Sequence, residues 1–137
     1  MKFFFDNNLS PILSNGIREL SLYDKRVEAV THLMHRFPRD AKDEDWMRAL
    51  ASDGQWIVIS QDSLRKNDLE REALRQSGLM VFVLDRQWSQ HRFWETAHNL
   101  VRWWPSIIDQ AARIEGGAAF RVPWRHTGGG RFLQIRL

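Results

Sequence analysis

Residues 55–62 read QWIVISQD, and this stretch decides the fold class. Its first six residues are rich in β-branched side chains, which favour a buried strand that ends near Asp62. Two further short apolar runs, KFFF at residues 2–5 and LMVFVL at residues 79–84, also predict buried strands. Short strands separated by helical segments are typical of an α/β fold with a mainly parallel central sheet.

Helical patterns fill the segments between these strands. Ser10 is a favoured N-cap residue and Pro11 follows at the first helical position, so a helix is expected to begin there. Asp43 is predicted to cap a second helix, which Gly54 ends. The remaining expected elements are a strand at residues 26–33 with Val27, Ala29 and Thr31 on one face, a helix at residues 64–76 before Gly78, and a helix at residues 93–113 that Pro105 breaks or kinks.

The composition excludes several classes of protein. The chain has no cysteine, so thiol catalysis, thiolate zinc sites and a disulfide framework are excluded, and a reducing cytoplasm is the expected location. Asp6 comes too early for the apolar core of a signal peptide. No run approaches the ~20 apolar residues of a membrane-spanning helix, so no membrane association is expected.

Positive charge is concentrated near the C-terminus. Residues 1–112 hold 15 Lys and Arg against 16 Asp and Glu, whereas residues 113–137 hold five Arg and one Glu. We therefore expect one domain over residues 1–112, followed by a basic extension over residues 113–137 that packs on it or trails from it. After Gly116-Gly117 the extension is expected to be irregular, with a hairpin turn at residues 127–130. Its charge suggests either a nucleic-acid partner or a solvated tail that aids solubility.

Three aspartates are expected to meet at one edge of the sheet. Asp6 follows the first strand and Asp62 follows the strand at residues 55–60. The carboxyl ends of parallel strands share an edge, and sites form there. The helix that begins at Asp43 is roughly 12–15 Å long, similar to the strand after it, so its start reaches the same edge.

Such a cluster requires positive charge. Two carboxylates ~4 Å apart repel by about 4 kcal/mol at an effective dielectric constant of 20. Hard oxygen ligands with open water positions suit Mg²⁺ or Mn²⁺, which can activate water for attack on a phosphodiester. Each aspartate alone would also fit an ordinary turn or helix cap, so the prediction rests on their combination.

The motifs MKFFFDNNLSP, KDEDW and IVISQD, in this order, resemble the PIN-like nucleases, and within them the branch of VapC-like toxins of bacterial toxin–antitoxin modules. That branch opens with a strand that ends in an Asp-x-Asn element, matched here by Asp6 and Asn8. An acidic helix start is matched at residues 43–46, and an aspartate after a later strand is matched by Asp62. The resemblance covers about residues 1–110.

The resemblance implies a three-layer α/β/α sandwich and a metal-dependent endoribonuclease, with Mg²⁺ or Mn²⁺ as cofactor. Asp6, Asp43 and Asp62 would be the catalytic metal ligands and RNA the substrate. Asp45 and Glu44 remain alternatives for the middle ligand, because the sequence does not fix the register of that helix.

Further roles follow from the same resemblance. Asp85 stands where many PIN domains carry a fourth acid. Arg65 and Lys66 lie just after Asp62, so they either contact the phosphates of a bound RNA strand or belong to a solvated helix face; Asn8 is a further candidate for contact with the RNA. A toxin of this type is held silent by an antitoxin protein that covers the acidic cleft, and homodimers are common in the family.

Three other functions share part of this pattern of acids. A non-catalytic PIN-like protein that binds a partner protein or nucleic acid is the main alternative. A phosphoacceptor receiver domain needs an acidic pair after its first strand and a lysine after its fifth, whereas this chain has Asp6-Asn7 and Asp85. A phosphatase with an Asp-x-Asp nucleophile is disfavoured because position 8 is asparagine.

The seven tryptophans divide into two predicted groups. The first falls on apolar faces and is expected in the core: Trp46, Trp56, Trp94 and Trp104. The second is expected on a partner surface where bases could stack: Trp88, Trp103 and Trp124.

Overall fold

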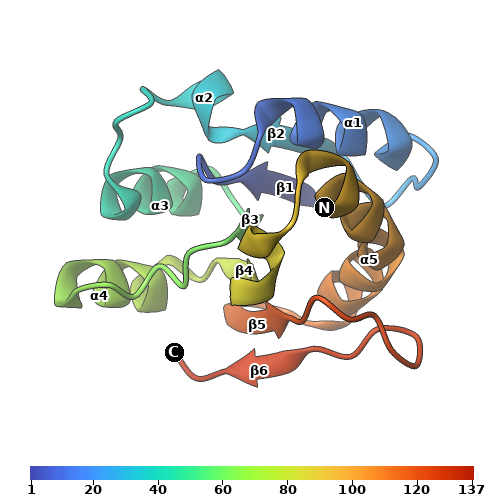
Figure 1. Ribbon diagram of the computed structural model, residues 1–137. Helices are drawn as coiled ribbons and strands as arrows, with labels where there is room; N and C mark the ends of the chain where they lie inside the picture. Colours follow the sequence, from blue (N-terminus) through green and yellow to red (C-terminus); the bar gives the residue numbers. More distant parts are fainter.

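Strand β3 (Trp56–Ser60) lies inside a six-stranded sheet of order β2-β1-β3-β4-β5-β6 in the computed structural model, which describes residues 1–137 (Figure 1). The other strands are β1 (Lys2–Phe5), β2 (Ala29–His32), β4 (Met80–Leu84), β5 (Ala118–Val122) and β6 (Leu133–Ile135). The first five strands in this order are parallel and β6 is antiparallel to β5. The predicted α/β fold with a mainly parallel sheet is therefore confirmed.

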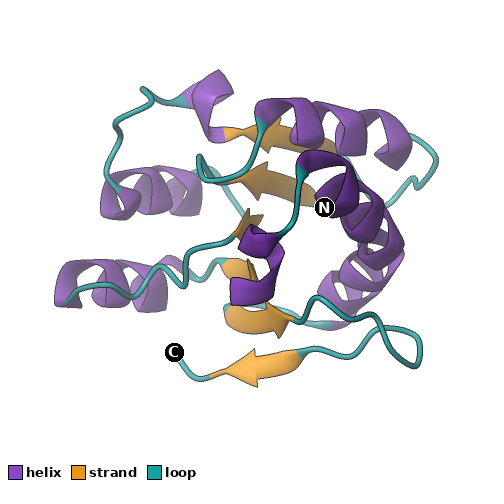
Figure 2. Cartoon of the chain, viewed as in Figure 1, coloured by secondary structure: helices purple, strands orange, loops and turns teal.

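Helices cover both faces of the sheet (Figure 2). They are α1 (Pro11–Ser21), α2 (Leu33–Arg36), α3 (Asp43–Ser52), α4 (Asp68–Ser77), the 3₁₀ helix η1 (Arg86–Gln90) and α5 (Phe93–Arg113). None of them is long and apolar enough to cross a membrane.

The alternation of side chains along the strands divides the core into two layers. Phe3 and Phe5 pack with α1 and α5 in one apolar cluster, whereas Phe4, between them, packs with α3 and α4 in the other. Both faces of β3 and β4 are buried in the same way. The structure is thus a three-layer α/β/α sandwich.

Several predicted boundaries and faces were wrong. In β2 the buried side chains are Val30 and His32 rather than those of residues 27, 29 and 31, because the strand is shorter and its faces are shifted by one residue. Helix α4 begins at Asp68 rather than near residue 64, where Leu64 is buried with φ 59°. Helix α5 continues through Pro105 rather than ending there, and Pro105 lines a groove together with Trp104 and residues of α1.

The C-terminal segment joins the sheet instead of remaining irregular after Gly117. Strand β5 pairs along the whole of β4, and the buried Trp88 donates its indole N–H to the Val122 carbonyl at 2.9 Å. Residues 127–130 form a turn between β5 and β6, closed by the Gly130 N–H on the Thr127 carbonyl at 3.0 Å. The basic segment is therefore packed on the same body as residues 1–112.

Two of the tryptophan assignments to the surface and one to the core were wrong. Trp88 and Trp103 are fully buried, and Trp94 is 81% exposed. Helix α5 buries a broad face that includes both Trp103 and Trp104, which places Trp94 on the opposite side. Trp124 is half-buried, with its ring stacked 3.6 Å from the ring of His91.

Candidate metal centre

Two aspartates meet where β1 and β3 end. The strands are parallel neighbours, and the Asp6 N–H continues their ladder by donating to the Ile59 carbonyl at 3.0 Å. The Ser60 hydroxyl donates to Asp6 Oδ2 at 2.9 Å and accepts the Asp62 N–H at 2.9 Å, so one side chain fixes both loops. The Asn7 N–H donates to Asp6 Oδ1 at 2.6 Å.

Two helix starts bring further carboxylates to this edge. Asp43 is the first residue of α3, with Lys42 rather than Asp43 at the N-cap position, and it accepts the Trp46 indole N–H at 3.0 Å. Glu70 lies in the first turn of α4, where its N–H donates to the Asn67 cap at 2.9 Å. The positive ends of both helix dipoles favour negative charge at these positions.

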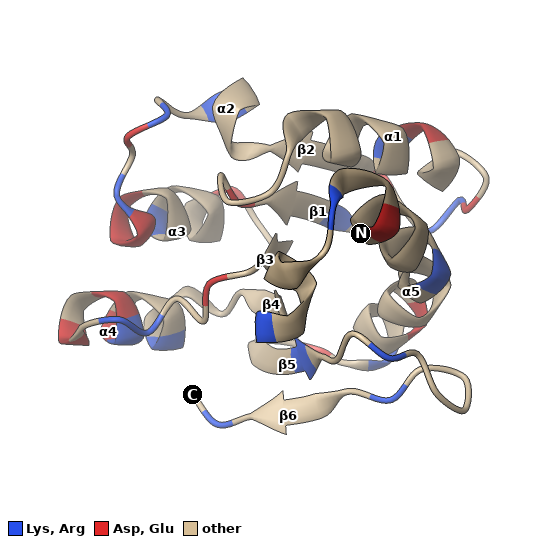
Figure 3. Ribbon diagram, in the orientation of Figure 1, with Lys and Arg blue, Asp and Glu red and all other residues tan.

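The carboxylates of Asp43, Asp62 and Glu70 converge. One oxygen from each lies within 4.8 Å of those of the other two. Figure 3 shows acidic residues at the starts of α3 and α4 and in the loop after β3. Glu70 is only 4% exposed, and Asp43 and Asp62 are half-buried. Asp6 is not part of this convergent group, but Ser60 links its carboxylate to the backbone of Asp62. We call the four residues the acidic cluster.

Burial, and to a smaller extent the charge of neighbouring acids, raises the pKa of two carboxyls in the acidic cluster. Burial raises the pKa of Asp6 to about 6, against hydrogen bonds from Ser60 and Asn7, and the charges of Asp43 and Asp62 raise it further. Burial also raises the pKa of Glu70 to about 7, helped by the neighbouring Asp43. Both carboxyls therefore tend to keep a proton that a cation could replace.

Glu70 has a second feature that fits a bound cation. Its Oε1 is buried without a hydrogen-bond donor, while Oε2 accepts from Asn67 Nδ2 at 3.3 Å. The nearby Asp43 and Glu70 carboxyls can share a hydrogen bond only when one of them is protonated and donates. A buried unpaired carboxylate oxygen is costly, and hard oxygen donors at this spacing fit a divalent cation such as Mg²⁺ or Mn²⁺.

Lys66 supplies some positive charge to the acidic cluster. Its Nζ lies 2.7 Å from Asp62 Oδ2, and this contact raises the pKa of the lysine. The other oxygen of Asp62 accepts the Leu64 N–H at 3.0 Å, which holds the loop after β3 in a tight turn. The lysine side chain is 66% exposed, so it can move away from Asp62.

The other predicted ligands lie apart from the acidic cluster. Asp45 points outward, with its side chain 65% exposed and 3.6 Å from Arg48. Glu44 is half-buried and is not part of the convergent group. Asp85 caps η1 by accepting the Gln87 N–H at 2.9 Å.

The predicted substrate-binding residues already have partners within the protein. Asn8 donates to Ser60 Oγ at 3.4 Å and accepts the Gln61 N–H at 3.2 Å, so it braces the loops after β1 and β3. Arg65 donates to the Arg136 carbonyl at 2.9 Å.

Glu70 was not predicted, although the sequence carries a signal for it. Asn67-Asp68-Leu69-Glu70 has the form of a capping box, in which a cap residue is followed three positions later by Glu. Placing the helix start near residue 64 made Glu70 look like an ordinary residue of a solvated helix face.

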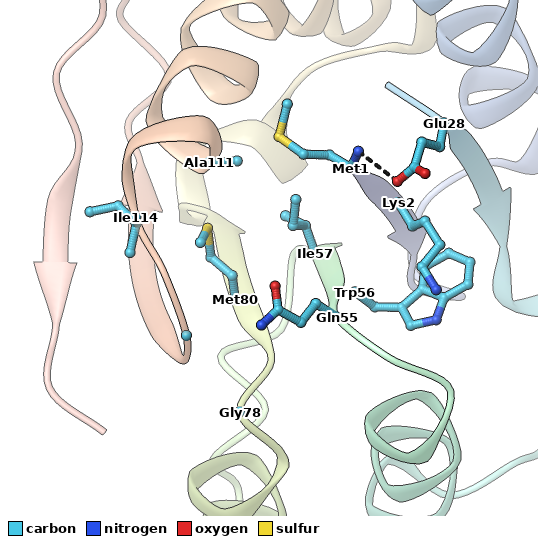
Figure 4. A pocket seen from close by; sticks show the side chains of 11 residues that line it. Met1, Lys2, Glu28, Gln55, Trp56, Ile57, Gly78, Met80, Ala111 and Ile114 are labelled. Carbon is cyan, nitrogen blue, oxygen red and sulfur yellow. Dashed lines mark hydrogen bonds and ion pairs between the residues drawn. The ribbon is translucent and has the colours of Figure 1, made fainter. Parts of the chain in front are cut away.

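A different cavity lies at the opposite edge of the sheet (Figure 4). Its volume is about 460 Å³, and it lies among the amino ends of β1, β3 and β4. The terminal ammonium of Met1 lies 3.0 Å from Glu28 at its rim, so that carboxylate already has a cationic partner. This cavity has no second carboxylate, so the convergent acids that could hold a metal lie at the carboxyl edge.

Comparison with known protein families gives a match. A family model described as a PIN-like domain matches residues 1–86, which is more than half of the chain and includes every acid of the cluster. Neither the curated proteins nor the solved structures give a match.

Proposed function

The chain belongs to the PIN-like domain family, and on that premise we propose that it is a metal-dependent endoribonuclease that hydrolyses RNA phosphodiesters at the acidic cluster. PIN-like domains are commonly nucleases, which makes a hydrolase of this general type the expected activity. The observation that carries the proposal is the convergence of Asp43, Asp62 and Glu70 within 4.8 Å beside the buried Asp6.

The four acids would hold Mg²⁺ or Mn²⁺. A bound ion of this kind supplies a nucleophilic water at neutral pH and stabilises charge on the phosphoryl oxygens. Asp6 and Glu70 are held in fixed positions by Ser60 and Asn67, so little reorganisation is needed on binding. Asp62 would exchange the ammonium of Lys66 for the metal.

Further aspects of this proposal rest on the resemblance of the motifs in residues 1–62 to VapC-like toxins. We propose that the protein is the toxin of a toxin–antitoxin module and acts in the cytoplasm. An antitoxin protein would then silence it by covering the acidic cluster. A homodimer is the expected assembly.

A non-catalytic PIN-like binding protein is the second candidate, and the position of Lys66 favours it. An ammonium 2.7 Å from Asp62 could serve as a permanent counter-ion in place of a metal. In that case Lys66→Gln would weaken the fold, because the acidic cluster would lose its cation. In a metal enzyme the same substitution would leave metal binding intact or strengthen it.

Cleavage assays test the proposal directly. Structured and single-stranded RNAs, with DNAs of the same sequence, are incubated with the full chain in Mg²⁺, Mn²⁺ or EDTA. We expect metal-dependent cutting of RNA that Asp6→Asn, Asp62→Asn and Glu70→Gln each reduce by at least about 100-fold. Asp45→Asn is the matched control, since it removes an exposed acid on α3 outside the acidic cluster.

Two outcomes would contradict the proposal. If the folded wild type binds no Mn²⁺ in calorimetry and cuts none of the RNAs, the binding-protein function takes its place. If Asp45→Asn is as damaging as Glu70→Gln, the metal is held by a different set of acids from the one that converges here.

A further inference from the structure

A second cavity adjoins the acidic cluster, with a volume of about 490 Å³. Asp62 lines this cavity and is also part of the acidic cluster, so a ligand in the cavity would lie next to the proposed metal. Two arginines from separate elements line it, namely Arg86 at the start of η1 and Arg121 on β5. Building on the proposed function, we propose that Arg86 and Arg121 form a phosphate-binding subsite that positions the RNA strand beside the acidic cluster.

Arg121 occupies an unusual position in its strand. The other four residues of β5 are buried, and only Arg121 is exposed. It pairs in register with Val83 of β4, close to the end of the parallel ladder. A single charged side chain in a buried strand, turned toward a cavity at the carboxyl edge, is better explained by a ligand than by solubility.

Arg86 is placed by the turn that follows β4. The Asp85 carboxylate accepts the Gln87 N–H at 2.9 Å and so fixes the start of η1. Asp85 also lines the cavity. The position that matches the fourth acid of the family therefore lies beside Arg86. Two fixed backbones therefore present the two guanidinium groups to the same space.

Neither guanidinium is already engaged. Among the ion pairs of the protein, none within 4.0 Å involves Arg86 or Arg121, although Asp62 and Asp85 share the cavity. By contrast, Lys66 is paired with Asp62 and Arg65 is bound to the C-terminal backbone. The two arginines are thus free cations in the cavity that Asp62 also lines.

The chemistry of these groups selects a phosphodiester. Guanidinium groups donate planar pairs of N–H bonds that match two phosphate oxygens. The two unpaired guanidinium groups attract an RNA backbone, which the carboxylates of the acidic cluster would otherwise repel. A strand with one phosphate at the metal and the adjacent one at the arginines would be held in register for cutting.

Binding measured without cleavage tests the subsite. A short fluorescein-labelled single-stranded RNA is titrated with the full-length protein in EDTA, at several salt concentrations, and its anisotropy is followed. We expect Arg86→Gln and Arg121→Gln each to weaken binding roughly tenfold, with the slope of log affinity against log salt reduced by ~0.7 per lost phosphate contact. Arg131→Gln is the control, because it removes the same charge from the C-terminal segment outside the cavity.

The proposal is overturned if Arg131→Gln weakens binding as much as Arg121→Gln, because the basic segment would then act through its total charge. It is also overturned if the double variant Arg86→Gln/Arg121→Gln binds and cuts RNA like wild type while Asp62→Asn abolishes cutting; the nuclease function would then survive without this subsite. Loss of RNA binding in the double variant, in a protein that never cuts, would support the subsite and refute the nuclease. Equal thermal unfolding temperatures exclude misfolding as the cause.

Discussion

Replacing Glu70 by glutamine is expected to stabilise the metal-free protein above pH 7. The pKa of Glu70 is raised from 4.5 to about 7 by burial and by the Asp43 charge. Between these values the unfolded chain has released the proton that the folded protein still holds. The free energy of unfolding therefore falls as the pH rises through this window. The loss is absent below pH 4.5 and reaches its full size above about pH 7.

The size of the effect follows from the same two pKa values. A pH unit corresponds to roughly 1.4 kcal/mol, so the rise from 4.5 to about 7 amounts to about 3 kcal/mol. A glutamine amide has the shape of the protonated acid and carries no charge. It can also donate to Asp43, which the ionised Glu70 cannot.

Urea unfolding in EDTA at pH 5 and pH 8 measures the effect. We expect the free energy of unfolding of Glu70→Gln to be nearly that of wild type at pH 5. At pH 8 it should exceed that of wild type by up to about 3 kcal/mol. Addition of Mn²⁺ at pH 8 should restore the stability of wild type and leave the variant unchanged. Asp45→Asn, which removes an exposed acid, should behave like wild type throughout.

A variant that is no more stable than wild type at pH 8 in EDTA would refute this reasoning. It would mean that the N-terminal dipoles of α3 and α4, with Lys66, already neutralise the acidic cluster. Mn²⁺ that stabilised both proteins equally would refute the role of Glu70 as a ligand.

Three further predictions concern single positions. Ser60→Ala removes the hydroxyl that donates to Asp6 at 2.9 Å, so we expect a loss of about 1–3 kcal/mol of stability and weaker Mn²⁺ binding by calorimetry. If neither quantity changes, water replaces the hydroxyl. Trp88→Ala should lower the free energy of unfolding by about 3–5 kcal/mol because the side chain is fully buried. Trp94→Ala, at an 81% exposed position, should change it by no more than about 0.5 kcal/mol, and similar losses in the two variants would contradict this difference in burial. Gly16→Ala lies within α1 with nothing within 4 Å of the added methyl group, so a gain of about 0.5–1 kcal/mol is expected in thermal or urea unfolding, and a loss would indicate a hidden clash.

The sequence was most informative where backbone periodicity alone decides the outcome. Strands β1, β3 and β4 were predicted almost to the residue, because apolar runs bounded by polar turns have few alternative structures. The parallel arrangement then placed Asp6 and Asp62 at one edge. That inference needed only the rule that strand ends coincide in a parallel sheet.

Prediction was weakest where a boundary or a helix face had to be chosen. Glu70 was missed because the apolar pattern of α4 extends back to Leu64, whose left-handed backbone in fact belongs to a turn. Trp88 and Trp103 were misplaced because burial depends on which helix or strand packs opposite them. That information arises only once β5 and α5 are docked on the sheet.

The position of β5 has a consequence for synthesis of the chain. Strand β4 is buried along its whole length and has β5 as its neighbour on one side. During translation every acid of the cluster emerges before residues 118–122, so the nascent chain passes through a stage at which the edge of β4 is bare. An open apolar edge is a template for aggregation. The last twenty residues of the chain therefore cover the edge of the sheet that the preceding part leaves open, and a truncation after α5 should yield insoluble protein with all its acids intact.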